Sequence, residues 1–353
     1  MGRKSPSLAA AVLLPLLFAS ALGEVHSQER KPVPPFEPLP AGVTRLTHFG
    51  ERADWAPDGR SIIFIEKTFG DVYRVEIANR TLLPLTHHYF HEGYTRALHL
   101  SNGDVLLSGA PEFDARNPWR SRNETAELWL LQKPFDRPPV PLGTRCTEGP
   151  AVSRRSMRIA WTIDHGDYPD RLPEGVSQMW VGEIDLGGDK PRLANQRMVL
   201  DSRSLPFRCN LETQDFRPPD EKELTFSGYG YQGTEVMGVD LETGKVTNYS
   251  NAPGQYDEPE GIFPDGRSSL VECDRHSKKG SGHVDIYRLR LDGSGNLERL
   301  TFFNDRPAYK SSNPSVSPDG NTIAFQEARS NEPAGVGHGI LLLSLDAAPP
   351  KKD

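Results

Sequence analysis

The chain has 353 residues, with 41 Lys and Arg, 48 Asp and Glu and a formal net charge of −7. An acidic chain without a basic stripe binds nucleic acid and anionic membranes poorly, because both require neutralisation of phosphates, so we exclude these partners. Its 32 glycines and 31 prolines lie mainly at turns, and 36% of its residues are hydrophobic, which is typical of an all-β secreted domain.

The first 21 residues have the organisation of a cleavable signal peptide. Arg3 and Lys4 precede an apolar run at 8–18, and Ala19-Ser20-Ala21 supplies the small residues of a cleavage site. The apolar run is short for a membrane span, and no cysteine follows it to carry a lipid. We therefore predict a soluble, secreted or periplasmic protein without a transmembrane segment.

Residues 22–40 are rich in proline: Pro32, Pro34, Pro35, Pro38 and Pro40. This composition favours an extended polar tether rather than a folded domain. Residues 41–346 contain the repeats described next, and we expect residues 347–353 to form a disordered tail.

Short segments built around Pro-Asp-Gly recur along the chain. Three copies are well preserved, at 55–66, 262–274 and 316–328, and three are weaker, at 99–110, 152–164 and 216–228. In this turn proline sets φ, the aspartate side chain caps the turn, and glycine accepts positive φ. The glycine position is held by Gly59, Gly103, Ser156, Glu221, Gly266 and Gly320. Because further strands follow each copy, the pattern predicts six blades.

The two ends of the chain depart from this repeat. Residues 83–88 and 298–303 each end a strand-rich unit, whereas the similar segment 44–48 has no unit before it, and the last unit stops without such an ending. The unpaired first segment and the incomplete last unit are both explained if residues 44–48 form the missing strand of the last sheet. We therefore predict an all-β fold, a six-bladed β-propeller closed by its N-terminal strand. The alternative, a two-sheet sandwich, does not explain six regularly spaced copies.

The Pro-Asp-Gly units and the Leu-Thr strand endings resemble the repeats of TolB-type β-propellers over roughly residues 44–346. These endings are Arg45-Leu46-Thr47, Pro84-Leu85-Thr86 and Arg299-Leu300-Thr301. The resemblance implies a propeller but no particular activity, because such repeats occur in the periplasmic TolB scaffold, in prolyl-oligopeptidase-like enzymes and in oligogalacturonate lyase.

The chain departs from each of these relatives. Only the Pro-rich tether stands where TolB has an α/β domain, and no Gly-x-Ser-x-Gly motif is present, so the resemblance implies no peptidase activity. The His and Gln metal cluster of the lyase has no residue-by-residue match. We therefore expect a lone secreted propeller that is not TolB itself.

The predicted loops differ in length between the two faces of the ring. Turns between first and second strands and between third and fourth strands are tight, whereas loops between second and third strands are long, as at 110–125 and 164–176. Because binding residues concentrate on loops held by a rigid scaffold, we assign the ligand to the long-loop face.

One position, eight residues before each turn glycine, marks the start of every innermost strand. It holds alternating acidic and hydroxyl residues: Glu51, Thr95, Glu148, Thr213, Glu258 and Ser312. The next position holds Arg52, Arg96, Gly149, Gln214, Pro259 and Asn313. Either these residues cap strand ends and join neighbouring blades, or they form a polar pocket for a sugar or a peptide end. The candidate ligand-binding residues are Glu51, Arg52, Arg96, Glu148, Glu258, Asn313, His91 and Glu92.

Histidines gather in the long loops and at their edges: His87, His88 and His91 beside Glu92, and His165, His276, His283 and His338. Imidazole and carboxylate are the usual ligands of divalent metals. These histidines have no fixed ligand spacing, so we expect solvated side chains and neither a metal nor another cofactor.

Two of the three cysteines are candidates for a disulfide. Cys146 and Cys209 precede the turns of adjacent blades by similar distances and on the same face, so an oxidising compartment would favour a bridge between them. Cys273 ends a predicted inner strand, and we expect it to be a free, buried thiol.

Two functions remain open. We favour a non-catalytic extracytoplasmic scaffold, a monomer that binds a protein partner or a glycan on its long-loop face. The alternative is a carbohydrate-active enzyme, a polysaccharide lyase or glycoside hydrolase, that uses Glu with Arg or His in the axial pocket. A deep pocket where Glu148, Glu258 and Arg96 converge would favour the enzyme. A filled channel with exposed aromatics at its mouth would favour the scaffold. These aromatics are Tyr89, Phe90, Phe113 and Trp119.

Overall fold

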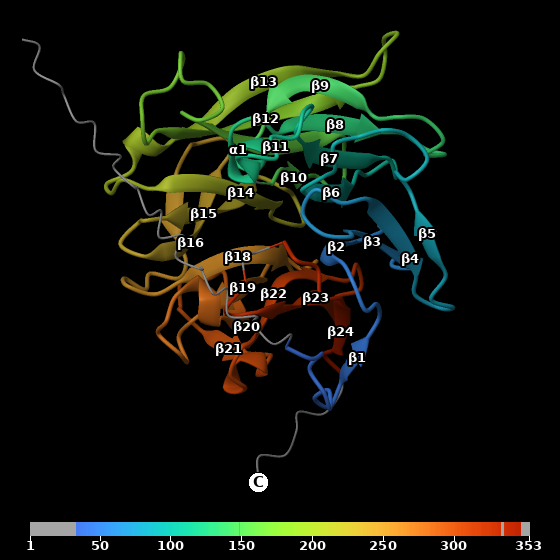
Figure 1. Cartoon of the computed structure of the whole chain (residues 1–353). Coiled ribbons are helices and arrows are strands. Elements are labelled where there is room, and N and C mark those ends of the chain that lie inside the picture. Colours follow the sequence, from blue (N-terminus) through green and yellow to red (C-terminus); the bar gives the residue numbers. More distant parts are fainter. Residues whose placement is uncertain (1–32, 148, 333–334, 347–353) are drawn as a thin grey trace, which may run out of the picture. The chain divides into compact units, whose positions relative to one another are not determined.

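Six antiparallel sheets of four strands each make up the described part of the chain, and they are arranged as the blades of a ring (Figure 1). The structure is a computed structural model that describes residues 33–147, 149–332 and 335–346. The six blades belong to one unit that begins at Pro35. The prediction of a six-bladed β-propeller is confirmed, and the predicted signal peptide (1–21) and tail (347–353) lie outside the described residues.

Blades 1 to 3 follow the chain in order. Blade 1 contains β2 (Glu51–Trp55), β3 (Ser61–Ile65), β4 (Val72–Glu76) and β5 (Leu82–Pro84). Blade 2 contains β6 (Arg96–His99), β7 (Val105–Gly109), β8 (Glu127–Leu131) and β9 (Val140–Arg145). Blade 3 contains β10 (Ala151–Val152), β11 (Arg158–Asp164), β12 (Ser177–Asp185) and β13 (Arg192–Asp201).

Blades 4 and 5 repeat this order, and blade 6 borrows its outer strand. Blade 4 contains β14 (Asn210–Phe216), β15 (Glu223–Tyr229), β16 (Thr234–Asp240) and β17 (Val246–Asn248). Blade 5 contains β18 (Asp257–Ile262), β19 (Ser268–Cys273), β20 (Asp285–Arg290) and β21 (Leu297–Arg299). Blade 6 contains β22 (Tyr309–Val316), β23 (Thr322–Arg329), β24 (Ile340–Ser344) and the N-terminal β1 (Val43–Arg45).

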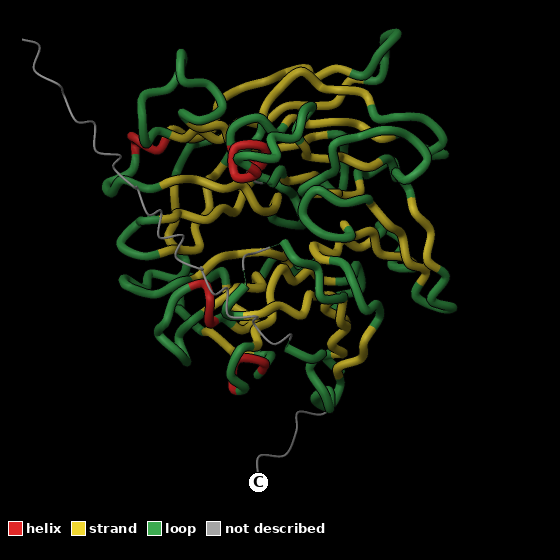
Figure 2. Tube along the Cα trace, in the orientation of Figure 1, coloured by secondary structure: helices red, strands yellow, loops and turns green. Residues whose placement is uncertain are grey.

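Helical segments are short and lie in loops (Figure 2). They are the α-helix α1 (Pro118–Asn123) and the 3₁₀ turns Ser202–Ser204, Ser281–His283 and Phe303–Asp305. Within the described residues, no helix is long and apolar enough to cross a membrane.

The Pro-Asp-Gly turns have the conformation that the sequence predicts. Gly59 has a φ of 70°, and the Asp58 side chain accepts a hydrogen bond from the backbone N–H of Arg60 at 3.0 Å. Glu221 holds the glycine position of blade 4 at a φ of 53°, which is costly for a residue with a side chain. Its carboxylate accepts a hydrogen bond from Ser153 of blade 3, so an interblade contact compensates for the strain.

The ring closes as predicted, through the pairing of β1 with β24. Val43 lies opposite Leu343 and Arg45 opposite Leu341, and Figure 1 shows the two strands side by side. The buried carboxylate of Glu327 reinforces this seam. It accepts hydrogen bonds from the guanidinium of Arg45 at 2.7 Å and from the backbone N–H of Phe36 at 2.8 Å.

The hydrophobic core is divided among the contacts between neighbouring blades. Alternate residues of one strand serve two of these contacts: Trp161 of β11 packs toward blade 2, and its neighbour Ala160 packs toward blade 4. The seam between blades 5 and 6 is similarly filled, with Phe303 and Phe325 at its centre. Each sheet is therefore apolar on both faces, as a propeller requires.

Part of the Pro-rich segment packs into the domain, although its composition predicts an extended tether. Phe36 is buried in the cluster between blades 5 and 6 and stacks on Phe303 with ring centroids 4.3 Å apart. The segment that the sequence predicts as a tether up to Pro40 therefore contributes a core residue. Burial of the large apolar ring of Phe36 is favourable enough to anchor this segment to the domain.

The predicted disulfide between Cys146 and Cys209 is wrong. Within the described residues all three cysteines are buried thiols that form no disulfide. Cys146 packs with Trp161 between blades 2 and 3, whereas Cys209 packs with Ala160 between blades 3 and 4. The sheet of blade 3 therefore separates the two sulfur atoms. Cys273 is a free, buried thiol, as predicted.

N-terminal truncations that retain β1 measure how much Phe36 contributes to the stability of the ring. A chain that begins at Pro35 should retain full stability. A chain that begins at Gly42 should lose roughly 3–5 kcal/mol of unfolding free energy, because the Phe36 ring is lost, and Phe36→Ala should cost the same. Urea unfolding measures these losses, with Phe90→Ala as the control, since Phe90 is 87% exposed. Equal stability of the Pro35 and Gly42 chains would contradict this role of Phe36.

Thiol titration tests the separation of the cysteines. When the protein is unfolded without reductant, we expect three reactive thiols per chain, because no pair can meet across blade 3. A single reactive thiol would show that a bridge forms after all.

Candidate functional site

Four innermost strands carry a one-residue β-bulge at a matching place. The register shifts between Glu51 and Asp54 in β2, Thr213 and Phe216 in β14, Pro259 and Gly261 in β18, and Ser312 and Ser315 in β22. A bulge sets two residues opposite one and redirects their side chains. Arg52 and Asn313 have positive φ angles of 57° and 45° at these bulges. Both side chains line the axial channel.

A pocket of about 420 Å³ lies at the long-loop end of the channel. Its rim takes Arg122 from the β7–β8 loop, Ser281 from the β19–β20 loop and His338 from the β23–β24 loop. The pocket therefore lies on the face that loop length predicts for a ligand.

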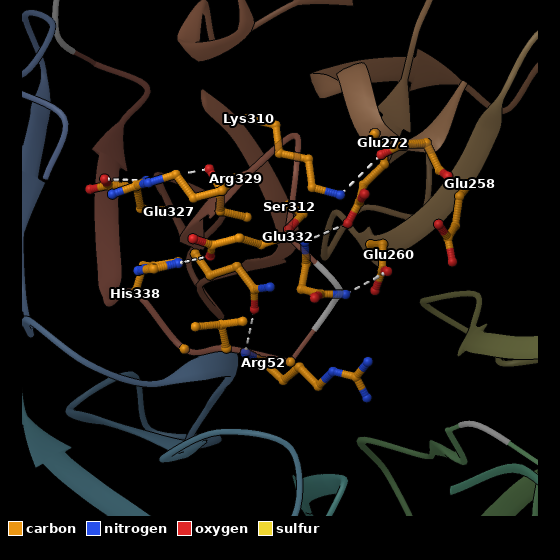
Figure 3. Close-up of a pocket in the computed structure, with 18 of the residues that line it drawn as sticks. Arg52, Glu258, Glu260, Glu272, Lys310, Ser312, Glu327, Arg329, Glu332 and His338 are labelled. Carbon is orange, nitrogen blue, oxygen red and sulfur yellow. Dashed lines mark hydrogen bonds and ion pairs between the residues drawn. The ribbon is translucent and has the colours of Figure 1, made fainter. Parts of the chain in front are cut away.

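Three carboxylates gather on one wall of this pocket (Figure 3). Glu258 and Glu260 come from β18, and Glu272 comes from the neighbouring β19, directly opposite Glu258. One oxygen from each of the three lies within 4.8 Å of the others. Such a group either shares protons or holds a cation, because three ionised carboxylates at this distance repel one another.

Hydrogen bonds fix the orientation of the acidic wall. The hydroxyl of Tyr256 donates to the carboxylate of Glu258, and the single hydroxyl proton of Tyr229 is shared between Glu258 and Glu212. Asn313 donates its backbone N–H to Glu272 at 2.6 Å and its side-chain amide to Glu260 at 2.7 Å. The bulge in β22 therefore holds two of the three carboxylates.

Burial changes the protonation of these groups. It raises the pKa of Glu258 to about 7, helped by the charge of Glu260, and it raises the pKa of Glu272 to about 7, helped by Glu258. Burial also raises the pKa of Glu260 to about 8, although Arg96 opposes this shift. Near neutral pH the wall therefore holds both protonated and ionised carboxyl groups, which is the condition for general acid and base chemistry.

Two arginines lie beside the acidic wall. Arg96 makes ion pairs with Glu212 at 3.4 Å and with Glu260 at 3.8 Å. Arg52 donates from its guanidinium to the carbonyl oxygen of Thr95 at 2.9 Å. The opposite wall carries a second acid–base pair, in which His338 contacts Glu332 at 2.5 Å (Figure 3).

The structure brings four of the eight candidate residues into the pocket wall: Arg52, Arg96, Glu258 and Asn313. Glu51 is buried and accepts a hydrogen bond from Thr68 at 2.7 Å instead of lining the pocket. His91 contacts Asp71 at 2.9 Å and stacks on Tyr94, and neither it nor Glu92 lines the pocket. Glu148 lies outside the described residues.

Counting from the turns missed Glu260, Glu272 and Glu212. Ungapped counting assigns one channel position to each strand and cannot anticipate the bulge after Pro259, which places Glu260 in the channel. Glu272 and Glu212 belong to the wall through strand pairing and tyrosine contacts that a single sequence does not reveal. The spacing Glu258-x-Glu260 on one strand was a sequence signal that could have indicated this site. Two acidic residues so close together on an inner strand are unfavourable unless they serve a function.

The acidic wall is the part of the described chain that could hold a metal. Three carboxylate oxygens within 4.8 Å suit a hard divalent cation such as Ca²⁺, Mg²⁺ or Mn²⁺. The loop histidines are not grouped in this way. His87 and His91 contact Asp71, and His276 contacts Tyr287 and Asn304.

Comparison with known proteins relates the chain to other propellers at the level of fold. No family model matches. An uncharacterised protein of Agrobacterium fabrum is 32% identical over 107 residues, which are 30% of this chain, so the chain spans about a third of that relative, 33% of its length.

Two solved structures illustrate the likeness. A gluconolactonase from Xanthomonas campestris is 12% identical, with a TM-score of 0.54 over 86% of this chain and 89% of the other. TolB from Acinetobacter baumannii is 16% identical, with a TM-score of 0.45 over 80% of this chain and 65% of the other. The likeness to the gluconolactonase is one of fold, and an identity of 12% supports no statement about activity.

The raised pKa values predict how stability depends on pH. Carboxyl groups whose folded pKa lies above the unfolded value of 4.5 keep their protons in the folded state, so stability falls as pH rises from about 4.5 through about 8. Glu260→Gln removes one ionisation and retains an oxygen for Asn313. We expect this variant to gain roughly 1–3 kcal/mol over the wild type near pH 9 and little near pH 5.

Urea unfolding at both pH values measures this difference. The exposed Glu242, on the β16–β17 turn, provides the control Glu242→Gln, which should follow the wild type. A variant that loses stability equally at both pH values would show that Glu260 serves only as an ionised structural partner of Arg96.

Proposed function

We propose that the protein is an extracytoplasmic carbohydrate-active enzyme whose reaction takes place in the pocket of the long-loop face. The observation that supports this proposal is the wall of Glu258, Glu260 and Glu272, which combines clustered carboxylates, raised pKa values and an adjacent arginine in a cavity of about 420 Å³. A pocket of this volume suits a sugar unit, and its polar wall suits hydroxyl groups.

The roles of the two β18 carboxylates differ because their partners differ. Glu260 has the most strongly raised pKa, about 8, so it is the proton donor to the leaving oxygen of a glycosidic bond. Glu258 accepts a hydrogen bond from Tyr256 and shares that of Tyr229 with Glu212, and both contacts favour its ionised form, so it is the base. In a hydrolase the base removes a proton from water, and in a lyase it removes one from the sugar ring.

Arg96 and Lys310 line the same pocket and supply positive charge beside the acidic wall. The charge of Arg96 lowers the pKa of Glu260, and that of Lys310 lowers the pKa of Glu272, although burial outweighs both effects. Cationic side chains in this position orient sugar hydroxyls or the carboxylate of a uronic acid.

A scaffold function has its own support in exposed aromatic residues. Phe90 and Trp119 are 87% and 62% exposed on the β5–β6 and β7–β8 connections. Large exposed apolar side chains favour a partner or glycan surface. This second candidate predicts binding that depends on Phe90 and Trp119 and is independent of the acidic wall.

Turnover assays on neutral and uronate-containing oligosaccharides test the enzyme. Hydrolysis is followed by new reducing ends, and elimination by the ultraviolet absorbance of unsaturated products. Glu260→Gln and Glu258→Gln should each lower kcat/KM by roughly 100-fold or more, while Glu242→Gln should leave it unchanged. Glycan binding without turnover that is lost in Trp119→Ala would favour the scaffold, and full activity of Glu260→Gln would refute the assigned acid.

The same assay with chelator and with added Ca²⁺, Mg²⁺ or Mn²⁺ separates two uses of the acidic wall. Activity that is insensitive to chelation supports proton transfer by the carboxyl groups themselves. Activity that requires the metal would make Glu258, Glu260 and Glu272 its ligands and would replace the acid and base roles given above.

A further inference from the structure

A second chamber of about 310 Å³ occupies the opposite end of the axial channel. The tight turns surround it, and slightly more than half of its wall surface is apolar. They include Trp55, Val152, Phe216 and Ile262, together with prolines of the Pro-Asp-Gly turns such as Pro57 and Pro264. The function proposed above takes place in the other chamber.

The two chambers meet at a shared wall, which we call the waist. Arg52, Arg96, Glu260 and Asn313 line both of them. Asn313 donates to Glu260 at 2.7 Å, and Arg96 lies 3.8 Å from the same carboxylate. The waist is thus linked across the channel by side chains from blades 2, 5 and 6, and the two chambers share this wall.

Most charges of the second chamber have a partner. Asp54 accepts hydrogen bonds from the guanidinium of Arg154 at 2.6 Å and from the backbone N–H of His99 at 2.7 Å, and its carboxylate also contacts the imidazole of His99 at 2.9 Å. Burial opposes ionisation of Asp54, but Arg154 and His99 outweigh it and hold its pKa well below the usual range. Arg154 is therefore neutralised within this cluster.

Asp215 is the exception. It lines the chamber from the bulge in β14, and its Oδ2 atom is shielded from solvent without a hydrogen-bond partner among the described residues. Thr225 holds the backbone of Asp215 on both sides, accepting from its N–H and donating to its carbonyl oxygen, each at 3.1 Å. The backbone that carries this carboxyl group is therefore held in place, and one of the two carboxyl oxygens is left unsatisfied, which is costly unless a ligand completes it.

Burial raises the pKa of Asp215 to about 6, with Arg154 acting against the shift. The group remains mostly ionised at neutral pH, so the ligand that satisfies it best is a cation. The apolar walls require that this cation carry an apolar body, because a hydrated metal ion would leave the walls without a partner.

We propose that the second chamber is a binding site for a small organic amine, whose ammonium group pairs with Asp215 while its apolar body packs against Trp55 and Phe216. Buried ion pairs of this kind combine a charge-assisted hydrogen bond with removal of apolar surface from water. The chamber volume of about 310 Å³ matches an amine with one aromatic ring or a short aliphatic chain.

Calorimetric titration of the full chain with phenethylamine, and with its neutral isostere 2-phenylethanol, tests the charge requirement. Benzylamine and hexylamine extend the series to other apolar bodies. The amines should bind roughly tenfold or more tightly than the alcohol at neutral pH. Equal affinities of amine and alcohol, or no binding by any amine, would overturn the proposal.

Variants assign the site. Asp215→Asn keeps the side-chain shape and should weaken amine binding by roughly tenfold or more, with melting temperature unchanged or higher. Glu272→Gln, which changes only the first chamber, should leave amine binding unaffected. Loss of amine binding in Glu272→Gln but not in Asp215→Asn would place the amine in the acidic pocket and refute the second site. Because the carbohydrate assay uses the other chamber, the two proposals fail separately.

Discussion

The buried carboxylate of Glu327 is the contact on which both the ring and its pocket depend. It accepts hydrogen bonds from Phe36 and Arg45 at the N-terminal end of the domain, and it pairs with Arg329 at 2.6 Å on its own strand. The same residue lines the axial pocket. One group therefore contributes both to closure of the ring and to the pocket wall, because loss of the β1 seam would also remove two of the groups that hydrogen-bond this buried charge.

The bulges of the inner strands turn a regular scaffold into a site. A regular strand alternates its side chains between the two faces of the blade, where they would enter the interblade cores. A one-residue bulge frees Arg52 and Asn313 from that alternation and directs them into the channel. Arg96 and Glu260 meet them there and divide the channel in two. Arg52, Glu260 and Asn313 thus reach the channel at local departures from the repeat.

Sequence patterns predicted what depends on repetition. The Pro-Asp-Gly turns gave the blade count, and the displaced ending at residues 44–48 gave the closure, because both are local signs of a periodic fold. What depends on register was not predictable from one sequence: Glu272 faces Glu258 only through strand pairing, and Glu260 enters the channel only through a bulge. The disulfide prediction failed for a related reason, since similar distances before two turns do not reveal that a whole sheet lies between Cys146 and Cys209.

The position of β1 also determines when the protein can finish folding. Phe36 and its partner Glu327 are 291 residues apart in the chain. The N-terminal strand can therefore pair only after nearly the whole chain has been synthesised. Contacts between such distant residues form slowly, because a very long loop has to be closed first. Blades 1 and 6 each carry an apolar face, and a chain whose ring has not closed would expose such surface, which promotes aggregation.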